Sequence, residues 1–267
     1  MNEKKQDFLK KPPILVGALH LPPFINSELK TQNLNYEKIE SYVIENVKKF
    51  QEGGFDDVYI QDQTPGNKTS LQTIAWTSAL ARVAKRAAPE IEIGIVIQSD
   101  DPEAAINIAS AAGGSFVRIK VFVGAMVKSY GIKEGSAGKA VKTRSDLYSN
   151  INLLTDIYDR TGDPLGDISL EKAIQQAVVN GSDGIILTGK NYEQTLQYIK
   201  RGSKVVDNSL PVFVGGGVNH DNINELLEFA DGVIVSSALK KDSGEGWDLD
   251  KIKEMVEKVK TTTPPKS

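Results

Sequence analysis

Two motifs rich in glycine and serine, near the carboxyl end of the chain, give the clearest chemical signal. The first is Gly215-Gly216-Gly217-Val218, and the second is an apolar segment that ends in Ser236-Ser237. Glycine lets the backbone approach an anion closely, and backbone N–H groups and serine hydroxyls donate hydrogen bonds to phosphate. We interpret these residues as a phosphate-binding cradle; the alternative is that the glycines only turn a strand into a helix. The cradle residues are Gly215, Gly216, Gly217, Ser236 and Ser237.

His20 is the second candidate for chemistry. It is one of two histidines and ends an apolar segment, in which strand alternation places its side chain on the face of Val16 and Ala18. Because histidine titrates near neutrality, it suits general acid–base catalysis or contact with a phosphate. The alternative is a structural histidine that is hydrogen-bonded to a loop carbonyl.

Charged residues at the ends of three further apolar segments complete the candidate site. Arg118 and Lys120 share one face of a predicted strand, and cations directed into a protein interior need anions. One interpretation is a structural ion-pair network with Asp62 and Asp156. The other gives these two aspartates catalytic roles, with Asp156 an acid or base opposite His20, and leaves Arg118 to bind a substrate anion. A depressed pKa would also allow Lys120 to form a Schiff base, although close carboxylates would oppose it.

Other chemical signals are weaker. Residues 131–140 resemble a P-loop superficially, but no glycine stands five residues before Gly138, and Ala140 replaces the required serine or threonine. Asp100-Asp101 could bind a metal, yet adjacent aspartates before Pro102 are more typical of a turn and a helix cap. We expect no organic cofactor, since no nucleotide-binding fingerprint is present, and we assign no metal-binding residues.

Eight apolar, strand-length segments must position these residues, and helical segments separate them. The barrel is favoured over an open doubly wound sheet, because polar residues gather where the strands end and the turn after the first strand, His20-Leu21-Pro22-Pro23, has no glycine. We predict a single (β/α)8 TIM barrel over residues 13–260, with tails at 1–12 and 261–267. The predicted strands are 14–20, 57–62, 91–98, 115–122, 151–158, 184–189, 211–218 and 232–240. The predicted helices are 36–52, 69–88, 102–112, 136–147, 170–180, 192–206, 222–229 and 249–260.

The composition excludes several function classes. The 267 residues carry 32 basic and 35 acidic side chains, and this balance argues against a protein that binds nucleic acid or an anionic membrane. The chain has no cysteine, which excludes disulfides, thiolate metal sites and a cysteine nucleophile. No apolar run is long enough to span a membrane, and the charged start lacks a signal-peptide core, so we expect a cytoplasmic protein.

The sequence resembles the BtpA/SgcQ family over roughly residues 14–260. The matching motifs are Gly17 through Pro23, Phe116-Val117-Arg118, Gly124-Ala125, Gly131-Ile132, Gly135 through Ala137, Asp156, Thr188-Gly189, Gly215 through Val218, Asn222, Ala230 through Val235, and Leu239-Lys240. The resemblance implies a barrel of the ribulose-phosphate-binding type. This sequence retains four polar residues of the family pattern, which are His20, Arg118, Asp101 and Asp156. We expect Arg118, Lys120 and Asp101 to contact the substrate.

The sequence also departs from the pattern of that family. Gln61-Asp62 stands where the family has Glu-Asn, and residues 96–101 replace an Asn-x-Leu-Arg-Asn-Asp run. Asp159-Arg160 stands where a Lys-His pair is expected, and Gly216 replaces a serine within the glycines. Several polar partners of the expected site are therefore changed, so that either the substrate differs or catalysis is weakened.

Three functions remain open. The first is an enzyme that acts on a phosphorylated sugar or phosphoribosyl compound by isomerase- or lyase-type acid–base chemistry. The second, implied by the family's namesake in photosystem I biogenesis, is a non-catalytic assembly or stability factor with a protein partner. The third is a barrel that senses a phosphorylated ligand without turnover. A homo-oligomer is compatible with each of them.

Overall fold

Eight parallel strands close into a barrel, which confirms the predicted fold. The computed structural model describes residues 13–24, 26–64, 66, 68–244 and 246–260, and the predicted tails lie outside these residues. The spatial order of the strands is β1-β11-β10-β9-β7-β4-β3-β2. They are β1 (Ile14–His20), β2 (Asp57–Gln61), β3 (Glu92–Val96), β4 (Phe116–Ile119), β7 (Asn152–Asp156), β9 (Gly184–Leu187), β10 (Val212–Val214) and β11 (Gly232–Val235).

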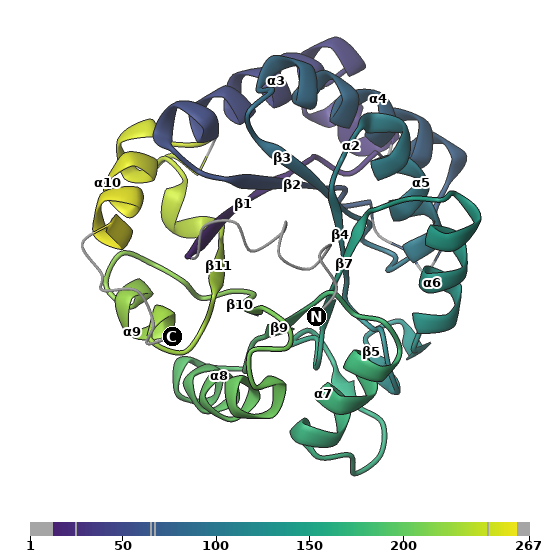
Figure 1. Cartoon of the computed structure of the whole chain (residues 1–267). Helices are drawn as coiled ribbons and strands as arrows, with labels where there is room; N and C mark the ends of the chain where they lie inside the picture. The colour runs from purple at the N-terminus through teal and green to yellow at the C-terminus, as the bar shows by residue number, and fades with distance from the viewer. Residues whose placement is uncertain (1–12, 25, 65, 67, 245, 261–267) are drawn as a thin grey trace.

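Helices surround this barrel on all sides (Figure 1). Every predicted helical segment contains a helix, and a short helix, α2 (Asn26–Thr31), was not predicted. The others are α3 (Tyr36–Gly53), α4 (Leu71–Ala87), α5 (Pro102–Ala112), α6 (Ala137–Asp146), α7 (Leu170–Val179), α8 (Tyr192–Val206), α9 (Ile223–Leu227) and α10 (Leu249–Lys260). The strands β10 and β11 are shorter than predicted, since the chain turns at Gly215 and at Ser236, and residues Ser237–Leu239 form a 3-10 helix, η1.

Side-chain caps fix where several helices begin. Asn35, Ser70, Ser169 and Asn191 each accept a hydrogen bond from the backbone N–H three residues later. Such a bond satisfies one of the donors that the first turn of a helix leaves free. Because each helix returns the chain to the amino end of the barrel, these caps lie on the same side of the molecule as the carboxyl ends of the strands.

A small antiparallel sheet lies beside the barrel and was not predicted. Its strands are β5 (Ala125–Lys128), β6 (Gly131–Glu134) and β8 (Asp163–Pro164), in the order β6-β5-β8. The hairpin of β5 and β6 follows β4, whereas β8 follows β7, the neighbour of β4 in the barrel. The loops that follow two adjacent barrel strands are therefore joined by backbone hydrogen bonds.

The barrel interior is packed with side chains. Phe116 and Phe213 are fully buried there, together with smaller apolar residues from the other strands. Glycines make room for the two rings: a Cβ at Gly94 would lie 2.2 Å from the Phe116 ring, and one at Gly232 would lie 2.6 Å from the Phe213 ring. The interior of the barrel is thus filled by side chains and forms no open channel, as in other TIM barrels.

We expect Gly94→Ala to destabilise the protein by about 1–3 kcal/mol, because the added methyl group overlaps the ring of Phe116 on the paired strand. Phe116→Leu in the same chain should restore part of this loss, although alone it also destabilises. Urea unfolding of both single variants and the double variant measures this. Losses that simply add would contradict the contact.

Candidate functional site

Polar residues form a ring at the carboxyl ends of the barrel strands. In β1, β4, β7 and β9 every second residue faces the interior, and continuing this alternation past the apolar core places polar side chains at the mouth. The polar members of this ring are His20, Gln61, Gln98, Lys120, Asp156, Thr188 and Ser236, and Gly215 occupies the corresponding position after β10. Catalytic residues of TIM barrels lie at this face.

A buried ion pair between Arg118 and Asp156 lies at the centre of the ring. Arg118 Nε donates to one oxygen of Asp156 at 2.8 Å and Nη2 donates to the other at 2.7 Å. Arg118 Nη1 also donates to the hydroxyl of Tyr59 at 3.3 Å and to the carbonyl of Gly215 at 3.5 Å. Burial alone would lower the pKa of Arg118, but the charge of Asp156 raises it, so the guanidinium stays charged.

This geometry matches the ion-pair interpretation of Arg118 and Asp156. Both oxygens of Asp156 accept bonds from one arginine, and the side chain of Asp156 is 2% exposed. Proton transfer by Asp156 and binding of a substrate anion by Arg118 stay predictions, and each would require part of this pair to open.

His20 is held as a neutral imidazole. Burial, together with the positive charges of Lys240 and Arg118, lowers its pKa to about 4, and a hydrogen bond with Gln61 opposes the shift. Gln61 Nε2 in turn donates to Gln98 Oε1 at 3.1 Å, so side chains at the ends of three neighbouring strands are linked. Near pH 7, His20 can therefore accept a proton but holds no ionisable proton to give.

Two other predicted site residues, Asp62 and Asp101, hold backbone in place. Asp62 accepts from Thr64 N at 2.8 Å and from Gln98 N at 3.0 Å, and alternation in β2 directs it away from the interior that Gln61 faces. Asp101 caps α5 through Ala104 N at 3.2 Å. Its other oxygen accepts from the Thr69 hydroxyl at 3.0 Å. The expected turn and cap are therefore present, whereas catalysis by Asp62 and substrate binding by Asp101 stay predictions.

Lys120 lies in the mouth without a carboxylate partner in the described part of the chain. Its Nζ donates to the backbone carbonyl of Gln98 at 2.7 Å. The nearby Asp100 uses both oxygens for the backbone N–H groups of Lys120 and Val121, each at 2.8 Å. Burial lowers the pKa of the Lys120 amine, and the charge of Asp100 opposes this. The sequence predicts that nearby carboxylates oppose a lowered pKa of Lys120. Asp100 is such a carboxylate, but it forms no ion pair with the Lys120 amine.

The glycine and serine motifs follow neighbouring strands. β10 pairs with β11, so Gly215–Gly217 lie beside Ser236 and Ser237 at the mouth. Gly215 N donates to the hydroxyl of Thr188 at 3.1 Å, and Gly217 has a φ of 76°, a conformation that favours glycine. Ser236 is half-buried and Ser237 is exposed. The structure thus brings the five predicted cradle residues together, and their binding of phosphate stays a prediction.

Arg160 also lies at this cradle, although its position in the sequence marks it only as a departure from the family pattern. A Cβ at Gly216 would lie 3.2 Å from Cζ, 3.3 Å from Nη1 and 3.5 Å from Nη2 of Arg160. The guanidinium therefore lies across Gly216, although 56 positions separate the two residues in the sequence. Only the fold brings them into contact.

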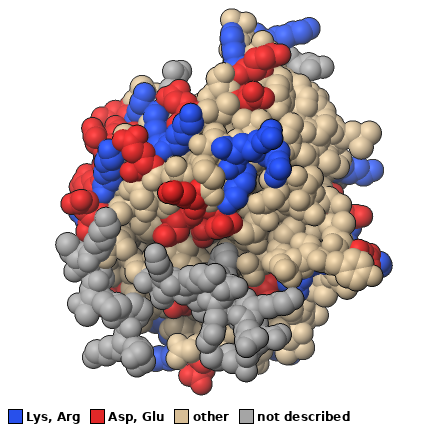
Figure 2. Space-filling view, turned by 45° about the horizontal axis from the view of Figure 1, so that its top comes forward, with Lys and Arg blue, Asp and Glu red and all other residues tan. Residues whose placement is uncertain are grey.

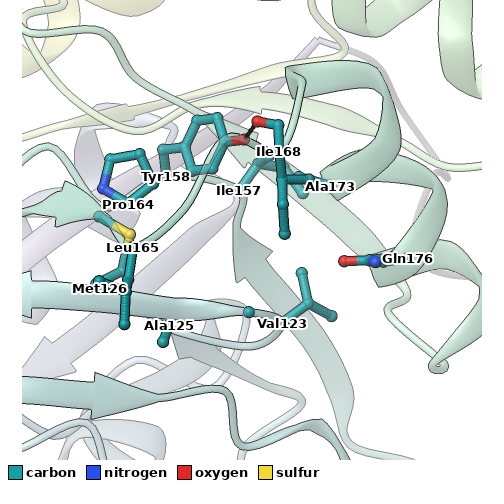
Figure 3. Close-up of a pocket in the computed structure, with 11 residues that line it drawn as sticks. Val123, Ala125, Met126, Ile157, Tyr158, Pro164, Leu165, Ile168, Ala173 and Gln176 are labelled. Atoms are coloured by element: carbon teal, nitrogen blue, oxygen red, sulfur yellow. Dashed lines mark hydrogen bonds between the residues drawn. The ribbon is translucent and has the colours of Figure 1, made fainter.

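An apolar pocket lies outside the ring, where the small sheet meets α7. Val123, Met126, Ile157, Leu165 and Ala173 line it, and Figure 3 shows Gln176 at one side and the hydroxyl of Tyr158 donating to the carbonyl of Ile168. Its empty volume is about 310 Å³, part of it open to solvent. Its lining contains no charged side chain, so it offers no acid, base or nucleophilic amine.

Basic and acidic side chains lie side by side on the face shown in Figure 2. None of the helices in the described part of the chain combines the length and hydrophobicity that crossing a bilayer requires. The same residues contain no group of three or more His, Asp or Glu placed to hold one metal ion.

Solved structures that are similar to this protein identify the class of its fold. The fold is that of TIM barrels such as KGPDC from Streptococcus mutans, with a TM-score of 0.58, 14% identity, and 94% of this chain and 98% of that chain covered. A 3-hexulose-6-phosphate synthase gives a TM-score of 0.58 at 15% identity, with 92% and 99% of the two chains covered. An N-(5'-phosphoribosyl)anthranilate isomerase from Pyrococcus furiosus gives 0.56 at 13% identity, with 93% and 100% covered. At these identities the similarity concerns the fold alone.

The family is defined by sequence. The chain belongs to the BtpA family, whose model matches residues 10–261. An uncharacterized protein from Methanocaldococcus jannaschii is 32% identical over 257 residues, which cover 93% of this chain and 95% of that protein. The photosystem I biogenesis protein BtpA from Synechocystis is 29% identical over 250 residues, with 90% and 84% covered.

We expect the free energy of unfolding to fall by up to about 3 kcal/mol as the pH falls from the ordinary His20 pKa of 6.5 toward about 4. In this range the unfolded chain takes up a proton at His20 and the folded chain does not. His20→Gln should lack this part of the pH dependence. Urea unfolding of both proteins from about pH 7.5 to about pH 4.5 measures it. Parallel stability curves would contradict a neutral, buried His20.

Proposed function

We propose that the protein binds a phosphorylated small molecule at the barrel mouth and catalyses an isomerase- or lyase-type proton transfer with His20 as the proton acceptor. One observation carries this proposal: Gly215, Ser236 and His20 lie at the carboxyl ends of three consecutive strands, β10, β11 and β1. A phosphate in the cradle would therefore lie beside the imidazole, within the reach of a small substrate. The sugar-phosphate and phosphoribosyl names of proteins with the same fold support this substrate class.

The charges around His20 suit such a substrate. An imidazole whose pKa is about 4 is a weak base, and the charges of Lys240 and Arg118 contribute to this. A phosphate dianion bound next to it would raise the pKa of His20 back toward its ordinary value, because an anion stabilises the imidazolium form. The substrate would thus strengthen the base that acts on it, and the base would stay weak in the empty site.

Thermal unfolding with a panel of inorganic phosphate, ribose 5-phosphate and ribose tests the site. The phosphorylated compounds should stabilise the protein, by about 2.7 kcal/mol when present at about 100 times the dissociation constant. Ribose should not. Ser236→Asp should abolish the stabilisation, because a carboxylate in the cradle repels the anion.

Each alternative function predicts another result. Absence of any shift with phosphorylated compounds in the folded protein would overturn the proposal and favour an assembly or stability factor, as the name of the Synechocystis relative suggests. Phosphate binding that is lost in Ser236→Asp, without turnover of any compound in a broad panel, would favour the ligand-sensing barrel. We further propose a cytoplasmic location, where phosphorylated metabolites are made and consumed.

A second chemistry is favoured by one observation, the bond from Lys120 Nζ to a neutral carbonyl instead of a carboxylate. An unprotonated Lys120 amine could add to the carbonyl carbon of a ketone or aldehyde and expel water, which gives an imine. Lys128, by contrast, is fully buried and paired with Asp159. Lys120 is thus the mouth lysine that is suited to covalent chemistry.

Borohydride trapping with dihydroxyacetone phosphate, a phosphorylated ketone, tests this second candidate. We expect the reduced adduct at Lys120, located by peptide mass spectrometry, and no adduct at Lys128. Lys120→Arg should remove the label while leaving phosphate-dependent stabilisation in place. Equal labelling of the wild type and Lys120→Arg would exclude Lys120 as an imine-forming residue.

A further inference from the structure

Arg160 projects from a turn that is fixed on both sides. Asp159 accepts hydrogen bonds from Thr161 N at 3.0 Å and Thr161 Oγ1 at 2.9 Å, and it forms a buried ion pair with Lys128. Gly162 N donates to the Asp159 carbonyl at 3.1 Å, which closes the turn around residues 160 and 161. The backbone that carries Arg160 is therefore held in place, although the side chain itself is exposed.

Gly216 supplies the space that the guanidinium occupies. The three atoms nearest to a Cβ at position 216 all belong to Arg160. The φ of Gly216 lies outside the left-handed region, in contrast to that of Gly217, so the backbone at 216 would accept another residue. A methyl group there would press on the guanidinium, which would have to shift by a few tenths of an ångström.

The charge of Arg160 is available for a ligand. Arg118 and Lys128 are paired with Asp156 and Asp159. Arg160 forms no ion pair or hydrogen bond with any residue in the described part of the chain. Burial raises the pKa of Tyr59 within the mouth, and the charge of Arg160, like that of Arg118, opposes this rise. A guanidinium presents N–H groups in a fork that matches two oxygens of a phosphate.

We propose that Arg160 binds two oxygens of the substrate's phosphate, and that Gly216 makes room for this guanidinium. This inference rests on the proposed function and narrows its substrate class to phosphate monoesters, whose terminal group offers several unesterified oxygens.

Calorimetric titration with inorganic phosphate and with methyl phosphate tests the role of Arg160. Arg160→Gln should raise the Kd about 10- to 100-fold, as the loss of charge-assisted hydrogen bonds does. Arg160→Lys, which keeps the charge but not the fork, should recover only part of the affinity. Arg86→Gln is the matched control, since it removes the same charge from an exposed side chain in the last turn of α4, at the opposite end of the barrel.

A double-mutant cycle tests the coupling to Gly216. Gly216→Ala should weaken phosphate binding when Arg160 is present, because the methyl group displaces the guanidinium. In the Arg160→Gln background, the same substitution should have little effect. An equal loss in both backgrounds would overturn the role given to Gly216, and thermal unfolding without ligand checks that each variant folds.

The outcomes separate this inference from the proposed function. If the wild type binds neither inorganic phosphate nor methyl phosphate, the proposed function fails, whatever Arg160 does. A second outcome is that the wild type binds both compounds, that Ser236→Asp binds neither, and that Arg160→Gln binds them as tightly as the wild type does. In that case the cradle is supported as the phosphate site, and the role of Arg160 is overturned. Dimethyl phosphate, a diester, should bind much more weakly than methyl phosphate to the wild type, and Arg160→Gln should narrow this difference.

Discussion

The arrangement of the mouth depends on one constraint, that charges inside a barrel must be neutralised there. Arg118 enters the interior directly above the ring of Phe116, and Asp156 from the neighbouring strand meets it with both oxygens. Removing either partner would leave the other buried and uncompensated, which typically costs 3–5 kcal/mol. The pair thereby forms a rigid floor between the apolar interior and the polar ring.

This neutralised floor determines which side chains remain for chemistry. Arg118 and Asp156 neutralise each other, whereas the basic side chains Lys120, Arg160 and Lys240 form no ion pair within the described part of the chain. His20 stays neutral mainly through burial, and the positive charges of Lys240 and Arg118 add to this. A site of this kind attracts an anion and holds its proton acceptor unprotonated until the anion arrives.

The fold could be read from the sequence because most barrel strands are nearly continuous apolar runs and several helices carry a start signal. The inward positions of His20 and Arg118 followed from strand alternation in the same way. Asp62 was harder, since Gln61 ends the strand inward and the aspartate turns to the loop backbone. The small sheet and the contact of Arg160 with Gly216 depend on the relative placement of distant loops, which no local pattern encodes.

The three-stranded sheet joins the loops after β4 and β7 into one hydrogen-bonded unit. Its hydrogen bonds and the Lys128–Asp159 pair mean that the turn with Arg160 takes its position from a hairpin about 30 residues earlier in the chain. If only one of these two loops were exchanged for that of another barrel, the hydrogen bonds and the ion pair that orient the remaining loop would therefore be lost. Where proteins with this arrangement of loops differ in ligand preference, we expect both loops to differ together. The two loops would then have to be inherited, or grafted onto another barrel, as one unit.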